Sequence, residues 1–407
     1  MSFYKLTIRD VPLDNKTVLV RADYNVPLTS SGEISDDLRI RASLPTIEYL
    51  LERGCKIVIM SHLGRPEGRD SSLSLEPIAQ RLAHLLRKDV RFVDECIGDK
   101  VFQAVKRAPK NSIIVLENVR FYPEEETNDP EFAKKLVKAT MARYFVQDCF
   151  GVAHRAHASI QAITMFIPSV AGLLLEREYT TITSAMLFPK RPLVAVIGGA
   201  KIKDKIPLIE RFIDIADQII IGGALANTFL AKSGTSVGQS KVETDEYDVI
   251  DRIYSSVKDK KGDEAGNFIL LPSDLAVGKS LTTEAKRQNV SLGGVQPDDY
   301  VLDVGSQTIE EIIRIVEGAG TVIWNGTLGY AELPEFSEGS ARLASALSGN
   351  KNITSIIGGG DTADFVLKWG DKNDGNFTHV STGGGASLEL MSGIKLPGIE
   401  SLLDAKG

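Results

Sequence analysis

The amino-acid sequence predicts an α/β protein of two domains, each a parallel β-sheet flanked by helices in a Rossmann-like, three-layer arrangement. Three observations predict this fold class. The chain has 407 residues, enough for two domains of ordinary size. Short β-branched runs alternate with amphipathic stretches of helical length. The strand-like runs are continuously apolar, which is typical of parallel strands whose two faces are both covered by helices.

The expected elements alternate along the whole chain. A run such as KTVLVRADYNV predicts a strand, and apolar residues at helical spacing predict the helix that follows it. In the first half we expect strands over residues 16–26, 55–63, 112–121 and 142–150, and helices over residues 39–53, 75–87 and 131–140. In the second half we expect strands over residues 192–200, 218–226, 267–277, 300–308, 321–330, 353–361 and 378–386.

The domain boundary is expected in the middle of the chain. The segment AGLLLEREYTTITSAMLFPKRP, residues 171–192, predicts a helix that ends at two prolines. We therefore expect a first domain over residues 1–172, an inter-domain hinge helix over residues 173–189 and a second domain over residues 190–392, with a deep cleft between the domains. The sequence shows no internal repeat and no low-complexity tract.

Composition excludes several classes of function. Hydrophobic residues make up 43% and charged residues 25%, the profile of a globular protein, and the net charge of −7 argues against a nucleic-acid-binding protein. Three cysteines stand far apart without metal-ligand spacing, which predicts reduced thiols. We expect no signal peptide and no membrane span, and hence a cytoplasmic protein.

Glycines follow the strands of the second half. Pairs or triplets occur at residues 198–199, 222–223, 358–360 and 383–385. An anion can approach the free N–H groups of a helix N-terminus closely only where no side chain intervenes. A tight strand-to-helix turn explains any single pair equally well. Four such turns in one half of the chain favour a site for phosphate groups.

Two familiar nucleotide motifs are missing. The stretch LAVGKS has Ser273 where a Walker motif needs its first glycine, so it is a decoy. A GxGxxG turn is also absent from the sequence, which argues against a dinucleotide-dependent oxidoreductase.

Charged residues accompany the glycines. Lys201 and Lys205 are one helical turn apart, so both can face one ligand from a helix start, although solvated surface lysines are the alternative. Asp361 follows three glycines, where it can cap its helix or hold the magnesium ion that travels with nucleotide phosphates. The two roles are compatible.

The strand ends of the first half carry basic and polar side chains instead. Several arginines that converge on one site suit a small, multiply charged anion, whereas each alone is better explained by a surface ion pair. The histidines of HRAH lack a third ligand at suitable spacing, so a zinc site is not expected. The residues in question are Arg21, Asp23, Asn25, His62, Arg65, Arg120, His154, Arg155 and His157, together with Arg39 and Arg41 at a helix start.

The two halves together predict phosphoryl transfer between a nucleotide and a small anion. A non-catalytic anion-binding scaffold would not require both kinds of site. A catalytically silent relative of such an enzyme stays open, because motifs do not measure turnover.

An ordered set of strings resembles one enzyme family. RADYNVP, DDLRIRASLPTI, SHLGRP, LENVRF, FGVAHRAHAS, IGGAKIKDKI, IGGALANTFL, WNGTLGYAE, IGGGDTADF and STGGGASLELMSG together resemble phosphoglycerate kinase from the first strand to the last helix. The resemblance implies reversible, magnesium-dependent transfer of a phosphoryl group between 1,3-bisphosphoglycerate with ADP and 3-phosphoglycerate with ATP, in glycolysis and gluconeogenesis. It further implies a monomer whose C-terminal tail, residues 393–407, returns to the first domain.

The resemblance also implies the site residues. Those for 3-phosphoglycerate would be Asp23, Asn25, Arg39, His62, Arg65, Arg120 and Arg155. Those for the nucleotide would be Gly199, Lys201, Lys205, Gly223, Asn325, Glu332, Gly358, Gly359, Gly360, Asp361 and Thr362, with Glu332 on the ribose and Asp361 on magnesium.

The implied chemistry needs no general base, because the acceptor carboxylate is already ionised at neutral pH. Catalysis then consists of positioning and neutralisation of charge on the transferring group. We expect Arg39 and Lys201 to provide that neutralisation, with Gly360 and Gly384 completing the catalytic set.

Some positions depart from the family pattern. Gln147 and Cys149 replace the usual Asn and Ala, and Thr327, Tyr330 and Ala331 replace the usual Pro, Val and Phe beside the expected nucleotide site. The base preference of the site therefore cannot be predicted from the sequence.

Overall fold

A computed structural model describes residues 3–373 and 375–405. The chain divides into two compact units, residues 1–180 with 395–407, and residues 181–394. The division falls inside helix α5 (Leu173–Leu187), which corresponds to the helix expected over residues 173–189. The role of this helix as a hinge stays a prediction.

The first unit contains a six-stranded parallel sheet in the order β3-β4-β2-β1-β5-β6. Its strands are short and rich in β-branched residues, as the sequence predicts. β1 lies inside the sheet and pairs in parallel with β2 and β5, so its residues are almost wholly buried. The bounds are β1 (Thr17–Arg21), β2 (Lys56–Met60), β3 (Val90–Val93), β4 (Ile113–Leu116), β5 (Tyr144–Gln147) and β6 (Ser169–Ala171).

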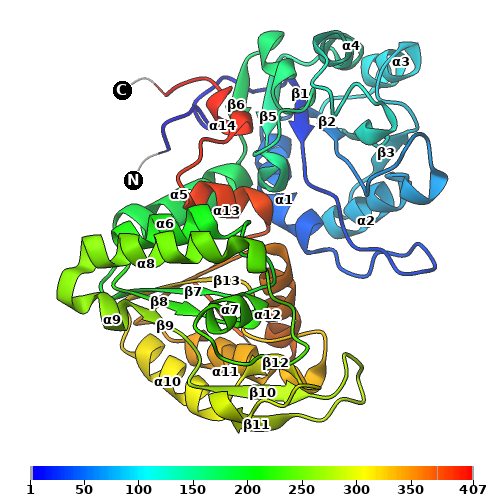
Figure 1. Ribbon diagram of the computed structural model, residues 1–407. Helices are drawn as coiled ribbons and strands as arrows, with labels where there is room; N and C mark the ends of the chain where they lie inside the picture. Colours follow the sequence, from blue (N-terminus) through cyan, green and yellow to red (C-terminus); the bar gives the residue numbers. More distant parts are fainter. Residues whose placement is uncertain (1–2, 374, 406–407) are drawn as a thin grey trace. The chain divides into compact units, whose positions relative to one another are not determined.

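Helices cover both faces of this sheet (Figure 1). Val18 and Val20 of β1 pack with α1 (Leu38–Glu52) and α2 (Glu76–Leu86), whereas Leu19 packs with α3 (Asp99–Arg107) and α4 (Pro130–Thr140). Side chains of a strand alternate between its faces, so one apolar strand supplies both cores.

The second unit contains another six-stranded parallel sheet, in the order β15-β14-β13-β7-β8-β9. The carboxyl ends of β7, β13 and β14 lie side by side, because Ile197 pairs with Asn325 and Asn325 with Gly358. The bounds are β7 (Leu193–Ile197), β8 (Gln218–Ile221), β9 (Ile269–Leu270), β13 (Thr321–Asn325), β14 (Thr354–Gly358) and β15 (His379–Val380).

Helices lie on both sides of this sheet as well (Figure 1). Val194, Val322 and Trp324 pack against α10 (Ser306–Glu317), α11 (Glu338–Leu347) and α12 (Gly360–Asn373). On the other side α6 (Ile206–Ile215) contacts α8 (Tyr247–Lys261) and α13 (Gly385–Met391), and α7 (Gly223–Lys232) also contacts α8. The predicted fold class, two parallel-sheet α/β domains, is confirmed.

A small antiparallel sheet was not expected. It has the order β11-β10-β12, from β10 (Asp274–Gly278), β11 (Gln288–Ser291) and β12 (Tyr300–Val304). The single strand predicted over residues 267–277 is in fact β9 and β10, in two different sheets. Pro272 lies between them, and proline has no N–H to continue a ladder. The strand expected over residues 300–308 is β12 of this sheet.

The two ends of the described chain meet in the first unit. Lys5 is 5% exposed and its Nζ donates to the carbonyl of Glu400 (2.8 Å) and to Asp404 Oδ1 (2.6 Å). The short helix α14 (Pro397–Glu400) is fixed by the N–H of Gly398, which donates to Ala153 O at 2.8 Å. Among the described residues, no helix is long and apolar enough to cross a membrane.

Candidate functional site

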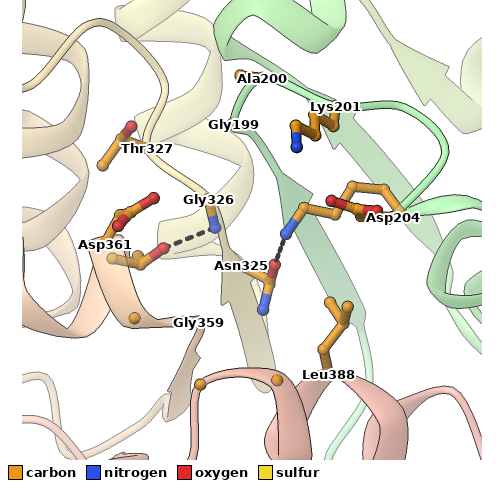
Figure 2. A pocket seen from close by; sticks show the side chains of 15 residues that line it. Gly199, Ala200, Lys201, Asp204, Asn325, Gly326, Thr327, Gly359, Asp361 and Leu388 are labelled. Atoms are coloured by element: carbon orange, nitrogen blue, oxygen red, sulfur yellow. Dashed lines mark hydrogen bonds between the residues drawn. The ribbon is translucent and has the colours of Figure 1, made fainter. Parts of the chain in front are cut away.

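A pocket opens at the carboxyl edge of the large sheet in the second unit. It has a volume of about 360 Å³, within the range of small-molecule sites. Figure 2 shows it between the chain that follows β7, the chain that follows β13 and the start of α12. The lining residues are Gly199, Ala200, Lys201, Asp204, Lys205, Asn325, Gly326, Thr327, Gly359, Gly360, Asp361, Thr362, Gly384, Gly385 and Leu388.

The glycine turns form much of this lining. β14 ends at Gly358 and α12 begins at Gly360, so the bare N-terminus of a helix borders the pocket. Gly359 between them has φ +94°, a conformation that side chains with a Cβ rarely adopt. Gly384 is the N-cap of α13 and has φ +49°. These two turns place unpaired backbone N–H groups where an anion would find them.

Lys205 and Asn325 meet inside the pocket. Lys205 Nζ donates a hydrogen bond to Asn325 Oδ1 (Figure 2). Burial lowers the pKa of Lys205 to about 8, with Asp204 and Asp361 acting in the opposite direction. The other end of the amide, Asn325 Nδ2, is buried and has no hydrogen-bond partner within the described part of the chain. The ammonium group of Lys205, whose charge is disfavoured by burial, and the unpaired Nδ2 of Asn325 together favour an anionic ligand.

The two lysines that the sequence places at a helix start are positioned differently. Both line the pocket, but α6 begins only at Ile206, so Lys205 is its N-cap and Lys201 lies on the preceding loop. Lys201 is exposed. The loop, not a helical turn, therefore brings the two side chains to the same pocket.

Most nucleotide residues expected from the sequence line this pocket: Gly199, Lys201, Lys205, Asn325, Gly359, Gly360, Asp361 and Thr362. Three others, Gly223, Glu332 and Gly358, lie outside the described set of lining residues. A Cβ on Gly223 would lie 2.7 Å from Gly199 N and 2.8 Å from Thr327 O, so close backbone packing already requires this glycine. Contacts of these residues with a nucleotide stay a prediction.

The pocket also contains residues that were not anticipated. Ala200, Asp204, Gly326 and Leu388 line it, and so does Thr327, which the sequence marks only as a departure from the family pattern. Gly326 and Thr327 directly follow Asn325, an expected site residue, so their proximity to the site could have been predicted from the sequence. Leu388 lies one helical turn into α13, and no local motif marks it. The decoy LAVGKS lies elsewhere, with Lys279 in ion pairs with Asp298 (2.7 Å) and Asp299 (2.8 Å).

A second polar cluster lies at the carboxyl edge of the sheet in the first unit. Asp23 follows β1 and is 6% exposed, and its Oδ2 accepts from Arg39 Nη1 at 2.9 Å. Asp23 Oδ1 accepts from Asn25 N at 3.2 Å, and Asn25 Oδ1 accepts from Gly64 N at 2.8 Å. The chain after β1 is thus tied to the chain after β2. Arg65, next to Gly64, is exposed.

Buried cations surround His62. Arg21 is 1% exposed and its Nη2 lies 3.2 Å from Nδ1 of His62. Arg120 reaches the same region from the turn after β4 and donates from Nη1 to Gly64 O at 2.6 Å. Burial, followed by the charges of Arg21, Arg120 and Arg39, lowers the pKa of His62 well below 6.5. His62 is therefore neutral at physiological pH.

The HRAH stretch contributes to the same electrostatic environment. Arg155 Nε lies 3.4 Å from His154 Nε2, and the charge of Arg155 acts on both Arg120 and His157. Burial, and then nearby arginines, lower the pKa of His157 to about 4. His157 also lies 3.8 Å from Glu125, which is fully buried. The structure thus brings Asp23, Asn25, Arg39, His62, Arg120 and Arg155 into one electropositive region.

Cys149 lies close to two of these residues. Its Sγ and ligand atoms of Asp23 and His62 are within 4.8 Å of one another, a proximity that cysteine spacing in the sequence does not reveal. Arg21 Nη1 lies 3.8 Å from this sulfur, and Arg39 is paired with Asp23. These guanidinium charges oppose a bound cation, and burial raises the pKa of the thiol. The region suits an anion better than a metal ion.

A phosphotransferase needs sites of these two kinds, one for polyphosphate and one for a small anionic acceptor, and this is the class of enzyme that the fold and the two clusters define. The family model described as phosphoglycerate kinase matches residues 8–394. The chain belongs to the phosphoglycerate kinase family.

Individual relatives agree with the family model. The chain is 44% identical to phosphoglycerate kinase of Dictyoglomus turgidum over 98% of both chains. It is 45% identical to that of Chloroflexus aggregans, over 99% of this chain and all of the relative. The structure of phosphoglycerate kinase from Coxiella burnetii superposes with a TM-score of 0.83 at 35% identity, over 98% of each chain. That from Pyrococcus horikoshii gives the same TM-score at 29% identity and the same coverage.

Proposed function

We propose that the protein catalyses reversible phosphoryl transfer between 1,3-bisphosphoglycerate with ADP and 3-phosphoglycerate with ATP. Membership of the phosphoglycerate kinase family supports this reaction. In glycolysis it would run toward ATP, and in gluconeogenesis toward 1,3-bisphosphoglycerate. A monomer in the cytoplasm belongs to the same proposal.

The arginine cluster of the first unit would hold 3-phosphoglycerate. The ligand carries a phosphate and a carboxylate, and guanidinium groups pair with both in bidentate fashion. The described contacts hold Arg39 and Arg120 in place through Asp23 and through the carbonyl of Gly64. Arg65 is exposed and so available to a ligand. The full set would be Asp23, Asn25, Arg39, His62, Arg65, Arg120 and Arg155.

The glycine-lined pocket of the second unit would hold the nucleotide phosphates. The bare turns at Gly359 and Gly384 would offer N–H groups, while Lys205 and the unpaired Nδ2 of Asn325 would offer side-chain donors. Gly199, Gly223, Gly358, Thr362 and Glu332 complete the proposed set, with Glu332 on the ribose. The single observation that supports the proposal most directly is the buried, unpaired Nδ2 of Asn325 beside the ammonium group of Lys205.

Magnesium is proposed to enter with the nucleotide. Mg²⁺ in phosphate sites uses one or two carboxylates together with phosphate oxygens. Asp361 and Asp204 are the carboxylates that line the pocket in the described part of the chain, so the donor set fits the ion. Asp361, in the first turn of α12, would hold it. When bound, the ion would neutralise phosphate charge.

The chain's own residues account for the rest of the chemistry. The acceptor is a carboxylate that is already ionised, so no residue has to remove a proton. This agrees with His62 and His157, whose lowered pKa values make them poor bases at neutral pH. Arg39 and Lys201 would neutralise charge that develops on the transferring phosphoryl group, supported by backbone N–H groups at Gly360 and Gly384.

A coupled assay tests the proposal. With ATP and magnesium present, purified protein should produce ADP only when 3-phosphoglycerate is added. Production of ADP that does not respond to 3-phosphoglycerate would contradict the proposal. Binding of both ligands without turnover would identify a catalytically silent relative, and binding of neither would leave a scaffold role.

A further inference from the structure

A loop of the second unit joins the pocket to the small antiparallel sheet. Residues 326–337 connect β13 to α11, and the first two of them, Gly326 and Thr327, line the pocket. The pocket end is fixed by hydrogen bonds from Gly326 N to Thr362 Oγ1 (2.7 Å) and from Leu328 N to Ser340 Oγ (2.9 Å). The remainder of the loop contains Tyr330 and Glu332.

One buried carboxylate fixes the far end of this loop. Asp303, on β12, is 3% exposed. Its Oδ2 accepts from the N–H of Gly339 at 2.9 Å, and its Oδ1 accepts from Val304 N at 2.9 Å. The N–H of Tyr330 donates to the carbonyl of the preceding residue on β12, Leu302, at 2.6 Å. The loop at Tyr330 and the start of α11 at Gly339 are therefore both attached to β12.

Two glycines, Gly329 in the loop and Gly339 at the start of α11, lie directly against this carboxylate. A Cβ on Gly329 would lie 2.4 Å from Cγ and from Oδ1 of Asp303, and a Cβ on Gly339 would lie 2.6 Å from Oδ1. Such distances leave no room for a side chain. The position of the Asp303 carboxylate and the course of the loop backbone thus determine each other.

Arg287 holds the carboxylate in place. Its Nη1 donates to Asp303 Oδ2 at 2.8 Å and its Nη2 to the carbonyl of Val304 at 2.8 Å, while its Nε lies 3.0 Å from Glu338 at the start of α11. The arginine side chain is 9% exposed and that of Asp303 is fully buried. Burial raises the pKa of Asp303 to about 6, and the contacts with Gly339 and Arg287 oppose that shift. Removal of one partner of a buried pair leaves a charge without compensation.

We propose that Arg287 and Asp303 are positioning residues for nucleotide binding, because they hold loop 326–337 and the start of α11 and so keep Gly326 and Thr327 in place at the pocket. Neither residue belongs to the described lining of the pocket, so both act through the loop. The proposal deepens the proposed function and depends on it, since the ligand whose affinity it concerns is the magnesium nucleotide.

Arg287→Met tests the proposal in the full-length protein. Methionine keeps much of the apolar packing but removes the charge and the donors. We expect the Kd for MgADP, measured calorimetrically, to rise about tenfold or more, as loss of one partner in a buried charged network does. The Kd for 3-phosphoglycerate and kcat at saturating substrates should stay within about twofold, because the loop lies in the other unit from the arginine cluster. Arg287→Lys, which restores the charge, should recover part of the affinity.

A matched control and a second variant keep the test decisive. Arg342, on α11, the helix that follows the loop, makes an exposed ion pair with Glu310 of α10. Arg342→Met removes this pair and should change neither Kd. Asp303→Asn preserves the shape of the side chain but replaces one oxygen by an NH2 donor, so it cannot accept both from Val304 and from Gly339 with Arg287 as the two carboxylate oxygens do. It should raise the Kd for MgADP as Arg287→Met does. Unchanged MgADP affinity in both variants would overturn the proposal, as would an equal loss of affinity for both substrates.

Hydrogen exchange separates this proposal from the proposed function. In nucleotide-free protein, the amides of Tyr330 and Gly339 should exchange faster in Arg287→Met than in the wild type or in Arg342→Met. If wild-type protein binds no MgADP, the proposed function fails, whereas faster exchange confined to residues 326–339 would still support the attachment. Unchanged exchange at these amides would contradict the attachment whatever the ligand.

Discussion

Lys205 donates a hydrogen bond to Asn325 at a point where both side chains face the glycine-lined pocket. The lysine comes from the N-cap of α6 and the asparagine from the end of β13, so two separate elements assemble the pair. Burial has lowered the pKa of Lys205 to about 8, which means that its charge is costly in the ligand-free protein. An anion bound beside it would offset that cost.

Nucleotide binding should therefore take up a proton at alkaline pH. Below about pH 7 Lys205 is already charged, so affinity should be constant. Above pH 8 the free protein has lost that proton, and the nucleotide phosphates must restore it, so affinity for MgADP should fall by up to about tenfold per pH unit. Calorimetry at pH 8 in buffers of different ionisation enthalpy should show uptake of about half a proton.

A charge-preserving variant provides the control. In Lys205→Arg the guanidinium stays protonated across this range, so both the proton uptake and the fall in affinity between pH 8 and 9 should disappear. An unchanged pH profile in Lys205→Arg would assign the titration to another group.

Arg39→Ala should lower kcat by on the order of a hundredfold or more, because it removes a donor that the proposed transition state requires. It also leaves Asp23, which is almost fully buried, without the partner at 2.9 Å that now holds it. Steady-state kinetics at saturating substrates measures the effect. Arg41→Ala is the matched control on the same helix. The Arg41 side chain is exposed and pairs at i,i+4 with Asp37, which keeps Arg81 as a second partner, so kcat should be unchanged.

A near-normal kcat in Arg39→Ala would remove this residue from charge neutralisation. A raised KM for 3-phosphoglycerate with kcat intact would instead limit it to substrate binding.

Strand ends and their polar residues could be predicted because their signal is local. A β-branched run followed by glycine, or by Asp and Asn, indicates a parallel strand and the loop at its carboxyl end. The register that pairs Ile197 with Asn325 and Asn325 with Gly358 then brings three such ends together, as the fold class implies. Asp23 and Arg120 follow from the same logic in the first unit, whereas Arg39 was marked by its place at a helix start.

Interactions between distant positions had no such signal. Arg287 and Asp303 become partners only through the antiparallel sheet, which the sequence conceals because its strands look like those of the parallel sheet. Cys149 meets His62 because they follow β5 and β2, the two strands that flank β1 in the sheet, and not through a motif. Gly223 carries the same pattern as Gly359, yet the backbone of Gly199 and Thr327 already fills the space beside it. Two turns with the same glycine pattern in the sequence can therefore differ in whether backbone or a pocket lies beside them.

Asp361→Asn should separate the two roles considered for Asp361. Because α12 begins at Gly360, Asp361 is in the first turn and not at the N-cap, and it acts on the helix through the charge of its carboxylate. Loss of that charge should change the free energy of unfolding by less than about 1 kcal/mol. It is a much poorer ligand for Mg²⁺, so the magnesium concentration needed for half-maximal activity should rise about tenfold or more. A magnesium titration of activity, with thermal unfolding in parallel, measures both.

Asp204→Asn is the control, since Asp204 is the other carboxylate lining the pocket within the described residues. A shift in magnesium requirement for Asp204→Asn alone would move the metal assignment to that residue. A stability loss without a magnesium effect in Asp361→Asn would leave only the stabilising effect of a negative charge at the helix N-terminus.

Gly360→Ala distinguishes a phosphate-binding turn from a turn that only reverses the chain. No described atom lies within 4 Å of the position where its Cβ would stand, and φ is not in the left-handed region, so the ligand-free protein can accept alanine. Gly360 is the first residue of α12, where replacing glycine should raise the free energy of unfolding by about 0.5 kcal/mol.

If phosphate oxygens approach the backbone at Gly360, the added methyl group occupies that space, and the Kd for MgADP should rise about tenfold. Melting temperature and nucleotide affinity would then change in opposite directions, which a purely structural glycine cannot produce. Gly266→Ala, at a position in the same unit that is equally open and lies outside the described pocket lining, should leave affinity unchanged. Unaltered MgADP binding in Gly360→Ala would mean that the phosphates lie elsewhere along the pocket.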